Sequence, residues 1–336
     1  MVQLSVLDQS PISKGSDAHA ALQQTLQLAM TTEQLGFTRF WVAEHHNTNG
    51  LASSSPEILI SHIASHTKTI RVGSGGVLLP QYSPYKVAEN FKTLEALFPG
   101  RIDLGIGRSP GGATATRLAL TDSIRKSMNE FPRQLKDLQG FLHDSLPAGH
   151  PFEEVMAAPL SDTQPEMWLL GISHRGARVA AENGTSFTYG HFISPGEGRR
   201  AAEEYFTKFQ PSLSLSQPKM NVCIFVVCAE TQEEAEELAV SQDIWLLNVG
   251  KGKDTQIPSV SETKEVPLSD EDKRIIRNNR RRAIIGTPEK VKEELLLLKE
   301  VYGTDEFMII TNIYDFEAKL RSYHLLADAF KLNKKG

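Results

Sequence analysis

The sequence predicts an α/β protein whose parallel strands close into a (β/α)8 TIM barrel, with an inserted segment before the last strand. Three observations lead to this prediction. Short apolar runs alternate with amphipathic helical patterns along the chain. These runs mostly lack a polar alternation, as is typical of parallel strands that are covered on both faces. Eight strand–helix pairs can be counted, and the length of 336 residues exceeds the roughly 250 of a plain barrel, which leaves room for an insertion.

The first half of the chain contains the more regular pairs. Gly36 ends the first helix, expected at residues 17–35, because glycine is favoured just after a helix. The next two helices begin at Ser55-Pro56 and Ser83-Pro84, where serine can cap the helix and proline suits its first position. The strands are expected at residues 4–7, 39–43, within 70–79 and at 102–106.

The second half repeats the pattern less cleanly. After a helix at residues 122–144 we expect strands at 167–170, 186–189, 220–227 and 307–311, with helices at 174–182, 195–209, 232–247 and 316–330. We expect all of residues 1–336 to form a single domain.

Residues 250–282 interrupt this rhythm, because they are polar, contain prolines and show no apolar period. We expect a long loop or disordered insertion there, acting as a mobile lid. The basic run at its end, residues 273–282, is interpreted as a solvated helical face beside the lid rather than an anion or nucleic-acid patch.

The composition restricts the classes of partner. A formal net charge of -5 and a pI of about 6.1 disfavour nucleic acid and anionic membranes. No apolar stretch is long enough to cross a membrane and the N-terminus does not resemble a signal peptide, so we expect a cytoplasmic protein. Cys223 and Cys228 lie an odd number of positions apart in one expected strand and therefore on opposite faces, where a disulfide or a shared metal is disfavoured.

Candidate site residues follow the second and third strands, at the end of the barrel where active sites lie. Glu44, His45 and His46 follow the second strand, and histidine can act as a general acid or base near neutral pH. Neighbouring histidines in an extended segment diverge, so we favour acid–base chemistry over metal binding and expect no metal site. Gly75 and Gly76 follow the third strand, either as a tight turn or as backbone that approaches a flat ligand.

Two further strand ends carry candidates for binding an anion. Arg108 and Ser109 belong to a glycine-rich loop after the fourth strand, where a guanidinium suits a phosphate or carboxylate. Gly171, Ser173 and Arg175 follow the fifth strand and open a helix, whose free N–H groups can bind phosphate. Ser173 can equally be a plain helix cap.

Together these segments resemble the luciferase-like monooxygenases. The resemblance is carried by FWVAEHHN, RVGSGGVLLP and SPYKVAENFKTLEALFPGRIDLGIGRSPGG, covers residues 1–112 and is strongest to the small single-chain bacterial branch. WLLGISHRGARVAAENG and the stretch from RAIIGTPEKVKEEL to YHLLADAF match more loosely. The resemblance implies a (β/α)8 fold and a monooxygenase that uses reduced FMN and dioxygen, through a C4a-peroxyflavin, on a small organic substrate.

The resemblance also implies roles for single residues. His45 matches the catalytic histidine of the luciferases, and Gly75-Gly76 match the pair that a non-proline cis peptide joins under the flavin ring. Arg108 and Ser173 match contacts to the flavin phosphate. The loop after the fifth strand departs from the family's pattern, and Arg175 is our candidate to supply the missing contact by its charge.

We expect reduced FMN to come from a separate flavin reductase, because no GxGxxG motif follows a strand. The resemblance further implies a homodimer through the helices at residues 56–66 and 84–98, where Phe91, Leu94 and Leu97 offer apolar surface.

Three alternatives remain open at this point. The first is an oxidoreductase that transfers hydride with the deazaflavin F420. The second is a flavin-binding protein without catalysis. The third, an unrelated barrel lyase or isomerase, rests on architecture alone. In the leading interpretation, Lys251, Lys253 and the arginines near Arg280 are expected to meet an anionic flavin or substrate when the lid closes.

Overall fold

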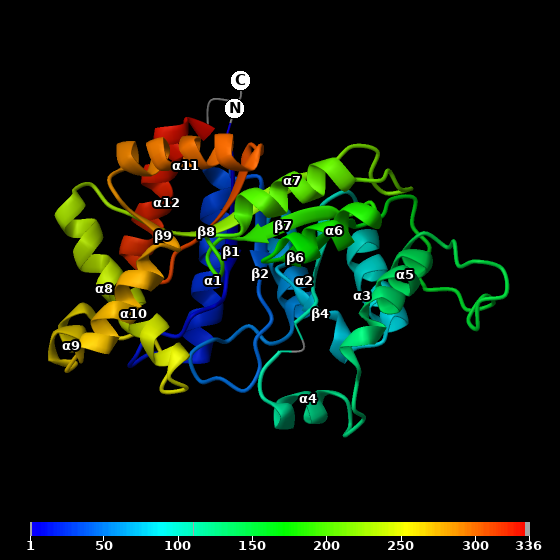
Figure 1. The fold of residues 1–336 in the computed structure, drawn as a ribbon, viewed down its shortest axis with the longest axis horizontal. Helices are drawn as coiled ribbons and strands as arrows, with labels where there is room; N and C mark the ends of the chain where they lie inside the picture. The colour runs from blue at the N-terminus through cyan, green and yellow to red at the C-terminus, as the bar shows by residue number, and fades with distance from the viewer. Residues whose placement is uncertain (1, 110, 333–336) are drawn as a thin grey trace.

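The computed structural model describes residues 2–109 and 111–332, and its strands form the predicted barrel (Figure 1). Within these residues, eight parallel strands pair in the order β10-β1-β2-β3-β5-β6-β7-β8, and β10 also pairs with β8, which closes the barrel. They are β1 (Gln3–Asp8), β2 (Arg39–Val42), β3 (Arg71–Ser74), β5 (Ile102–Gly107), β6 (Glu166–Gly171), β7 (Ser186–Gly190), β8 (Met220–Cys228) and β10 (Glu306–Ile310). The predicted (β/α)8 fold is confirmed.

Two short strands extend the barrel wall at its carboxyl-terminal end. β4 (Val77–Leu78) pairs with the last residues of β5, and β9 (Ala283–Gly286) pairs with the last residues of β8. The sequence predicted a strand within residues 70–79, but the structure divides that range into β3 and β4. The break lies at the Gly75–Gly76 peptide bond, which is cis.

Helices surround the barrel as predicted for most of the chain. They are α1 (Ala18–Gln34), α2 (Pro56–His66), α3 (Pro84–Leu97), α5 (Phe131–Leu142), α6 (His174–Glu182), α7 (Gly198–Lys208), α8 (Gln232–Gly250), α11 (Pro288–Tyr302) and α12 (Phe316–Phe330). The start of β1 lies at the top of Figure 1, whereas α4 (Thr114–Leu120), α9 (Val260–Glu265) and α10 (Asp270–Arg280) lie at the bottom. These three helices therefore flank the carboxyl-terminal mouth of the barrel.

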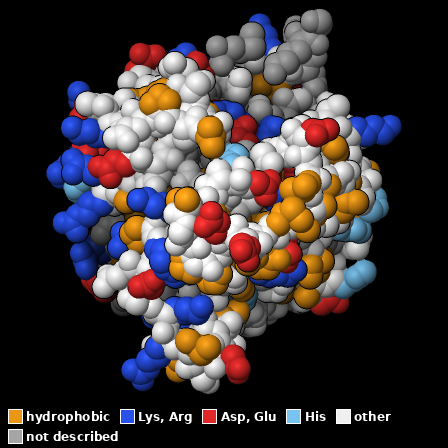
Figure 2. Space-filling model, turned by 90° about the vertical axis from the view of Figure 1, so that its right-hand side faces the viewer, with side chains coloured by type: hydrophobic (Ala, Val, Ile, Leu, Met, Phe, Trp, Pro, Cys, Tyr) orange, Lys and Arg blue, Asp and Glu red, His pale blue; other side chains and the backbone are white. Residues whose placement is uncertain are grey.

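The prediction of one helix over residues 122–144 is wrong. Asp122 and Ser123 have φ angles of 49° and 64°, in the left-handed region, so the chain turns there. The helix α5 begins only at Phe131, and Pro132 lies in its first turn. Before it, residues 111–130 form an arm that carries α4 and projects from the barrel at the bottom of Figures 1 and 2.

Figure 2 shows the face that carries α5 and the long connection to β6, where hydrophobic side chains gather among charged ones. The large hydrophobic residues exposed on this connection are Phe152, Val155, Met156 and Leu160. The ring of Phe152 also stacks on Phe141 of α5, at 6.5 Å between centroids. This contact fixes the connection on the outside of the barrel, away from the mouth.

The prediction of a loop or disordered insertion at residues 250–282 is also wrong, because α9 and α10 occupy most of this segment. Each helix begins with a capping box, formed by Ser259 with Glu262 and by Ser269 with Asp272. Arg280 at the end of α10 binds Asp243 of α8 at 2.7 Å. Local caps and ion pairs, which an apolar period does not reveal, therefore order this segment. The interpretation of 273–282 as a helical face agrees with α10.

Apolar side chains fill two main compartments, beside a small third cluster that includes Val227 of β8, Ala235 of α8 and Ile285 of β9. The larger lies between the strands and the surrounding helices, and the smaller lies inside the barrel and its mouth. Cys228 belongs to the larger compartment and Cys223 to the smaller, so the two free thiols lie on opposite faces of β8 as predicted. None of the helices described is long and apolar enough to span a membrane.

Candidate active site

Charged side chains close the amino-terminal end of the barrel. Asp103 is fully buried and accepts hydrogen bonds from Arg39 at 2.8 Å, Trp41 at 2.9 Å and Arg71 at 2.8 Å. Arg39 also binds Glu306 at 2.7 Å. These arginines hold the pKa of Asp103 below its usual range. Removing one partner of such a buried pair costs about 3–5 kcal/mol, so this end is a rigid floor and not an entrance.

Above this floor, glycines form one side of the barrel. Gly73 and Gly75 lie on or after β3, Gly105 and Gly107 lie on β5, and no side chain fits at several of these positions. A Cβ atom at Gly105 would lie 2.0 Å from the carbonyl oxygen of Ser74, and one at Gly75 would lie 2.5 Å from Leu7. The wall between β3 and β5 is therefore backbone, and Gly75 and Gly107 are partly exposed on it.

The predicted glycine pair lies in this wall. The Gly75–Gly76 bond is the one non-proline cis peptide among the described residues. A Cβ atom at Gly76 would approach the carbonyl oxygen of Gly105 to 2.8 Å, closer than real side chains come. Ser74 stabilises the junction, because its Oγ donates to the Gly105 carbonyl oxygen at 2.9 Å and accepts from the Gly105 N–H at 3.0 Å. A flat ring can therefore approach the backbone here without meeting a side chain.

The structure separates Glu44, His45 and His46, which the sequence predicted as one catalytic group. Glu44 is buried and its carboxylate accepts from the backbone N–H of Leu78 at 2.8 Å and from the Tyr82 hydroxyl at 2.6 Å. The His46 Nε2 atom lies 2.7 Å from the same carboxylate. Burial and the adjacent carboxylate raise the pKa of Tyr82. Glu44 and His46 thus hold β4 and the segment after it against the end of β2.

His45 lies on the other side of this extended segment. Its Nε2 atom is 3.1 Å from the Nε2 atom of Gln9, at the end of β1. Gln9 is contacted in turn by Asn312, at the end of β10, whose Nδ2 atom donates to Gln9 Oε1 at 2.7 Å. Burial lowers the pKa of His45 to about 4, and the nearby ring of His46 adds to this effect. His45 is therefore neutral at neutral pH, in a position to exchange a hydrogen bond with a bound molecule.

The anion-binding candidates lie side by side on the rim. Gly107 of β5 is paired in register with Leu170 of β6, so the residues that follow the two strands are neighbours. Arg108 and Ser109 are exposed there. Ser173 caps α6, accepting from the Gly176 N–H at 3.4 Å.

Arg175 is exposed in the first turn of α6. His174, beside it, lies 3.3 Å from Glu197, which places one carboxylate near this helix start. The sequence-predicted residues thus come together on the ends of four adjacent strands, β2, β3, β5 and β6.

Residues 251–258, here called the rim segment, cover part of the opposite side of the mouth. Ile257 is buried among the apolar residues inside the barrel, and its N–H donates to the carbonyl oxygen of Ile12 at 3.0 Å. The Thr255 carbonyl oxygen accepts from Trp245 of α8 at 2.9 Å and lies 1.8 Å from where a Cβ atom at Gly50 would be. The rim segment is therefore packed closely onto the loops that follow β1 and β2.

The basic side chains expected to close over a ligand are mostly engaged elsewhere. Lys251 forms an ion pair with Asp272 at 2.5 Å, and Arg280 binds Asp243. Neither side chain is therefore available to an anion at the mouth, contrary to the expectation from the sequence. Lys253 is exposed. Exposed cations at the rim therefore include Lys253 on this side, and Arg108 and Arg175 on the side of β5 and β6.

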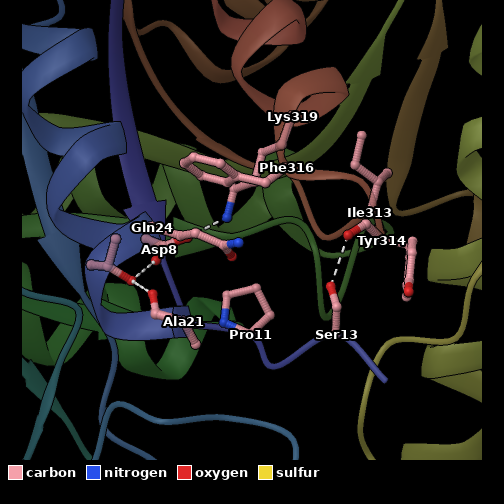
Figure 3. Close-up of a pocket in the computed structure, with 10 residues that line it drawn as sticks. Asp8, Pro11, Ser13, Ala21, Gln24, Ile313, Tyr314, Phe316 and Lys319 are labelled. Carbon is pink, nitrogen blue, oxygen red and sulfur yellow. Dashed lines mark hydrogen bonds and ion pairs between the residues drawn. The ribbon is translucent and has the colours of Figure 1, made fainter. Parts of the chain in front are cut away.

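A buried ion pair fixes the end of β1 (Figure 3). Lys319 of α12 binds Asp8 at 2.6 Å, and the Thr25 hydroxyl donates to the same carboxylate at 2.7 Å. Asp8 and Lys319, labelled in Figure 3, line a cavity of about 10 Å³ together with Thr25, and this is the size of a single water molecule. This cavity is too small for a substrate, and its ion pair instead anchors the strand from which Gln9 extends.

Sequence reasoning missed three residues of this site. Gln9 and Asn312 contact each other across 303 positions, and Tyr82 meets Glu44 across 38. The only signal in the sequence was their place after a strand or within a loop next to one. Among the described residues, no group of three or more His, Cys, Asp or Glu side chains could hold a metal ion.

Known proteins resemble this chain over its whole length. A family model described as luciferase-like monooxygenase matches residues 2–305. The chain is 55% identical to the uncharacterized protein YceB of Bacillus subtilis, covering 98% of this chain and 100% of the relative. It is 38% identical to an N-acetyl-S-alkylcysteine monooxygenase of the same organism, covering 98% of each. The solved structure of apo-MsnO8 has a TM-score of 0.91 at 37% identity and 99% coverage of both chains.

Two more distant solved structures share the fold and hold different cofactors. One is the oxygenating constituent of 3,6-diketocamphane monooxygenase from Pseudomonas putida in complex with FMN, with a TM-score of 0.70, 18% identity and coverage of 98% and 97%. The other is an F420-dependent secondary alcohol dehydrogenase with an F420–acetone adduct, with a TM-score of 0.69, 15% identity and 98% coverage of each chain. At these identities the likeness concerns the fold alone.

Proposed function

Because the chain belongs to the luciferase-like monooxygenase family, we propose that it is a flavin-dependent monooxygenase that binds reduced FMN and oxidises a small organic substrate with dioxygen. The observation that carries the proposal is the backbone wall between β3 and β5, with His45 on the neighbouring strand end. Bound reduced flavin would supply the electrons that activate dioxygen. The residues of the chain bind it, orient it and exclude water.

The donors on the rim suit the two parts of FMN. The partly exposed backbone at Gly75 and Gly107 suits an aromatic ring, which needs close approach and no bulky side chain. Arg108 and the first turn of α6 suit a phosphate, because a guanidinium and free N–H groups at a helix start both favour an anion. Arg175 adds positive charge at the same turn, whereas Glu197 beside His174 opposes it.

His45 is our candidate for the residue that contacts the reacting atoms. Its low pKa makes it a neutral hydrogen-bonding group at neutral pH rather than a cation. A neutral imidazole carries one N–H group and one acceptor nitrogen, so it can donate or accept a proton without first being protonated or deprotonated. Glu44, predicted as catalytic, instead has both carboxylate oxygens engaged with Leu78, Tyr82 and the Nε2 atom of His46, so we assign Glu44 and His46 to holding β4 in place.

Binding and turnover assays distinguish FMN from F420 as the cofactor. We expect micromolar or tighter binding of reduced FMN, and oxidation of a substrate only when dioxygen, FMN and an added flavin reductase are all present. The substrate panel should include N-acetyl-S-alkylcysteines, because a relative is named for them, and aldehydes. Hydride transfer with reduced F420 and no need for dioxygen would refute the monooxygenase proposal. Binding of FMN without any turnover would favour a flavin-binding protein.

We further propose a homodimer through α2 and α3, although the residues that can form the interface differ from those expected from the sequence. Phe91 and Leu94 are buried inside the protomer and cannot contribute, whereas Leu97 and Ile58 are 60% and 67% exposed. A pocket of about 280 Å³ also opens along α3, lined by Val87 and Phe91 of this helix and by Glu57 of α2 among others. Light scattering at high concentration tests this, and a monomer would reject it.

A further inference from the structure

Two buried amides connect His45 to the strands that close the barrel. Gln9 follows β1 and is 6% exposed, and Asn312 follows β10 and is fully buried. Asn312 Nδ2 donates to Gln9 Oε1 at 2.7 Å, and Gln9 Nε2 lies 3.1 Å from His45 Nε2. The backbone N–H of His45 donates to the Ser53 carbonyl oxygen at 2.9 Å, so the histidine is held at both its backbone and its ring.

The chemistry of an amide gives this chain of contacts a direction. A glutamine side chain accepts through its oxygen and donates through its nitrogen. Since Asn312 donates to the oxygen of Gln9, the Gln9 NH2 group faces His45 and can only donate. His45 Nε2 must then accept, and the single proton of the neutral ring lies on Nδ1.

We propose that Gln9 and Asn312 are positioning residues that hold His45 as the neutral tautomer with its proton on Nδ1, and so present an N–H donor to the bound substrate or cofactor. The first part of this statement concerns the protein alone, whereas the presentation of the donor rests on the proposed function. Nδ1 has no hydrogen-bond partner in the described part of the chain, which leaves its proton for a bound molecule.

The surroundings of the ring support a neutral state. Burial lowers the pKa of His45, and the charged form of His46 would repel a proton on it. Glu44, the nearest carboxylate along the chain, is turned toward His46 and Tyr82 rather than toward His45. To accept a proton from Nε2, Gln9 would have to turn its oxygen to the ring, and Asn312 would have to turn with it.

Substitutions at Gln9 distinguish direction from mere packing. Gln9→Met keeps the length of the side chain but removes the donor, so the proton should distribute between Nδ1 and Nε2. Gln9→Glu replaces the donor by a carboxylate, which can only accept. It should move the proton to Nε2 and raise the pKa of His45. Asn312→Leu should act like Gln9→Met, because the Gln9 amide is then free to turn.

A matched control comes from the same strand end. Thr311 is buried beside Asn312, and its hydroxyl donates to the Val226 carbonyl oxygen at 2.8 Å without contacting His45. Thr311→Val should therefore lower stability while leaving the tautomer and pKa of His45 as they are in the parent protein. This control separates a general effect of losing a buried hydrogen bond from an effect of the amides on the ring.

The test is NMR of the full-length, flavin-free protein with ¹⁵N-labelled histidine. Long-range ¹H–¹⁵N correlations distinguish a protonated ring nitrogen from an unprotonated one, and the His45→Gln spectrum assigns the signals. We expect a protonated Nδ1 in the parent protein and in Thr311→Val, and a protonated Nε2 in Gln9→Glu. A protonated Nε2 in the parent protein, or an unchanged tautomer in both Gln9 variants, would overturn the proposal.

A second measurement links the tautomer to the reaction. With reduced FMN, dioxygen and a substrate found by the panel, Gln9→Met should lower kcat by about tenfold or more, with KM little changed, because it weakens a group whose whole contribution is about 10²- to 10⁴-fold. An unchanged kcat would refute the claim that Gln9 holds His45 so that its Nδ1–H donates to the bound substrate or cofactor. If the tautomer is as expected but no oxidation with FMN occurs in any variant, the proposed function fails and the role of the amides in the free protein stands.

Discussion

His45 should make the stability of this protein sensitive to mild acid. The pKa of its ring in the folded state is lowered by burial to about 4, against an ordinary value of 6.5. Between these values the unfolded chain binds a proton that the folded protein excludes. Protonation therefore favours unfolding, and the free energy of unfolding should fall as the pH drops from about 7 toward about 4.

The size of this effect follows from the two pKa values. At about pH 7.5 the ring is neutral in both states and contributes no pH dependence. By about pH 5 the unfolded state is almost fully protonated at this position and the folded state is not, which corresponds to about 2 kcal/mol of lost stability. For a domain with a free energy of unfolding of about 5–15 kcal/mol, a loss of this size is measurable.

Equilibrium unfolding in urea of the parent protein and His45→Gln provides the assay. Burial also lowers the pKa values of His143 and His191, but both residues are present in both proteins, and their contributions cancel in the comparison. The parent protein should lose about 2 kcal/mol more than His45→Gln between about pH 7.5 and pH 5. Equal pH dependence in the two proteins would show that the folded ring titrates normally, and the argument for a neutral His45 would fail.

Substitutions at three further positions, Glu44, Gly50 and Arg108, test the rest of the site. Glu44→Gln can keep most of the hydrogen bonds around β4 and should retain most activity, whereas Glu44→Ala should lose both activity and stability. If both variants fold and are inactivated equally, Glu44 is catalytic. In Gly50→Ala the added Cβ would clash with the Thr255 carbonyl oxygen, so limited proteolysis should cut the rim segment faster than in the parent protein. Gly196→Ala is the control, because its added Cβ lies in open space, and equal cutting rates in the two variants would contradict the reasoning. Arg108→Ala should weaken FMN binding by about 1.5–3 kcal/mol, or about 10- to 150-fold, by isothermal titration, and unchanged affinity would reject its contact with the phosphate.

The fold could be predicted because its signals are local and repeated. Apolar runs, helix starts at Ser-Pro and glycine stops each mark one element, and their alternation leaves few architectures. The helix predicted over residues 122–144 failed because its periodicity spans Asp122 and Ser123, whose positive φ angles the pattern does not reveal. At residues 250–282 the sequence contains the capping boxes that begin at Ser259 and Ser269, but without an apolar period such boxes alone do not predict a helix.

The sequence was enough to predict where the candidate site residues lie, but not which contacts each of them makes. Strand ends meet at one edge of a barrel, so the positions of His45, Gly75 and Arg108 along the chain were enough to bring them to one rim. The partners that hold them are Tyr82 for Glu44 and Gln9 for His45, and each pair lies tens of residues apart. Such contacts depend on which strands are neighbours in the closed barrel, and the pattern of single residues does not contain that information.

The separation of Glu44 and His46 from His45 has a simple geometric cause with a chemical result. Successive side chains of an extended segment point to opposite sides, so residues two apart share a side and the residue between them faces away. The carboxylate of Glu44 therefore neighbours His46, and the hydrogen-bond partner of the His45 ring among the described residues is the uncharged amide of Gln9. A carboxylate at hydrogen-bond distance would favour the imidazolium form, whereas an amide donor favours the neutral ring. The same triplet thus supplies an anchor for the glycine wall on one side and an uncharged proton donor on the other.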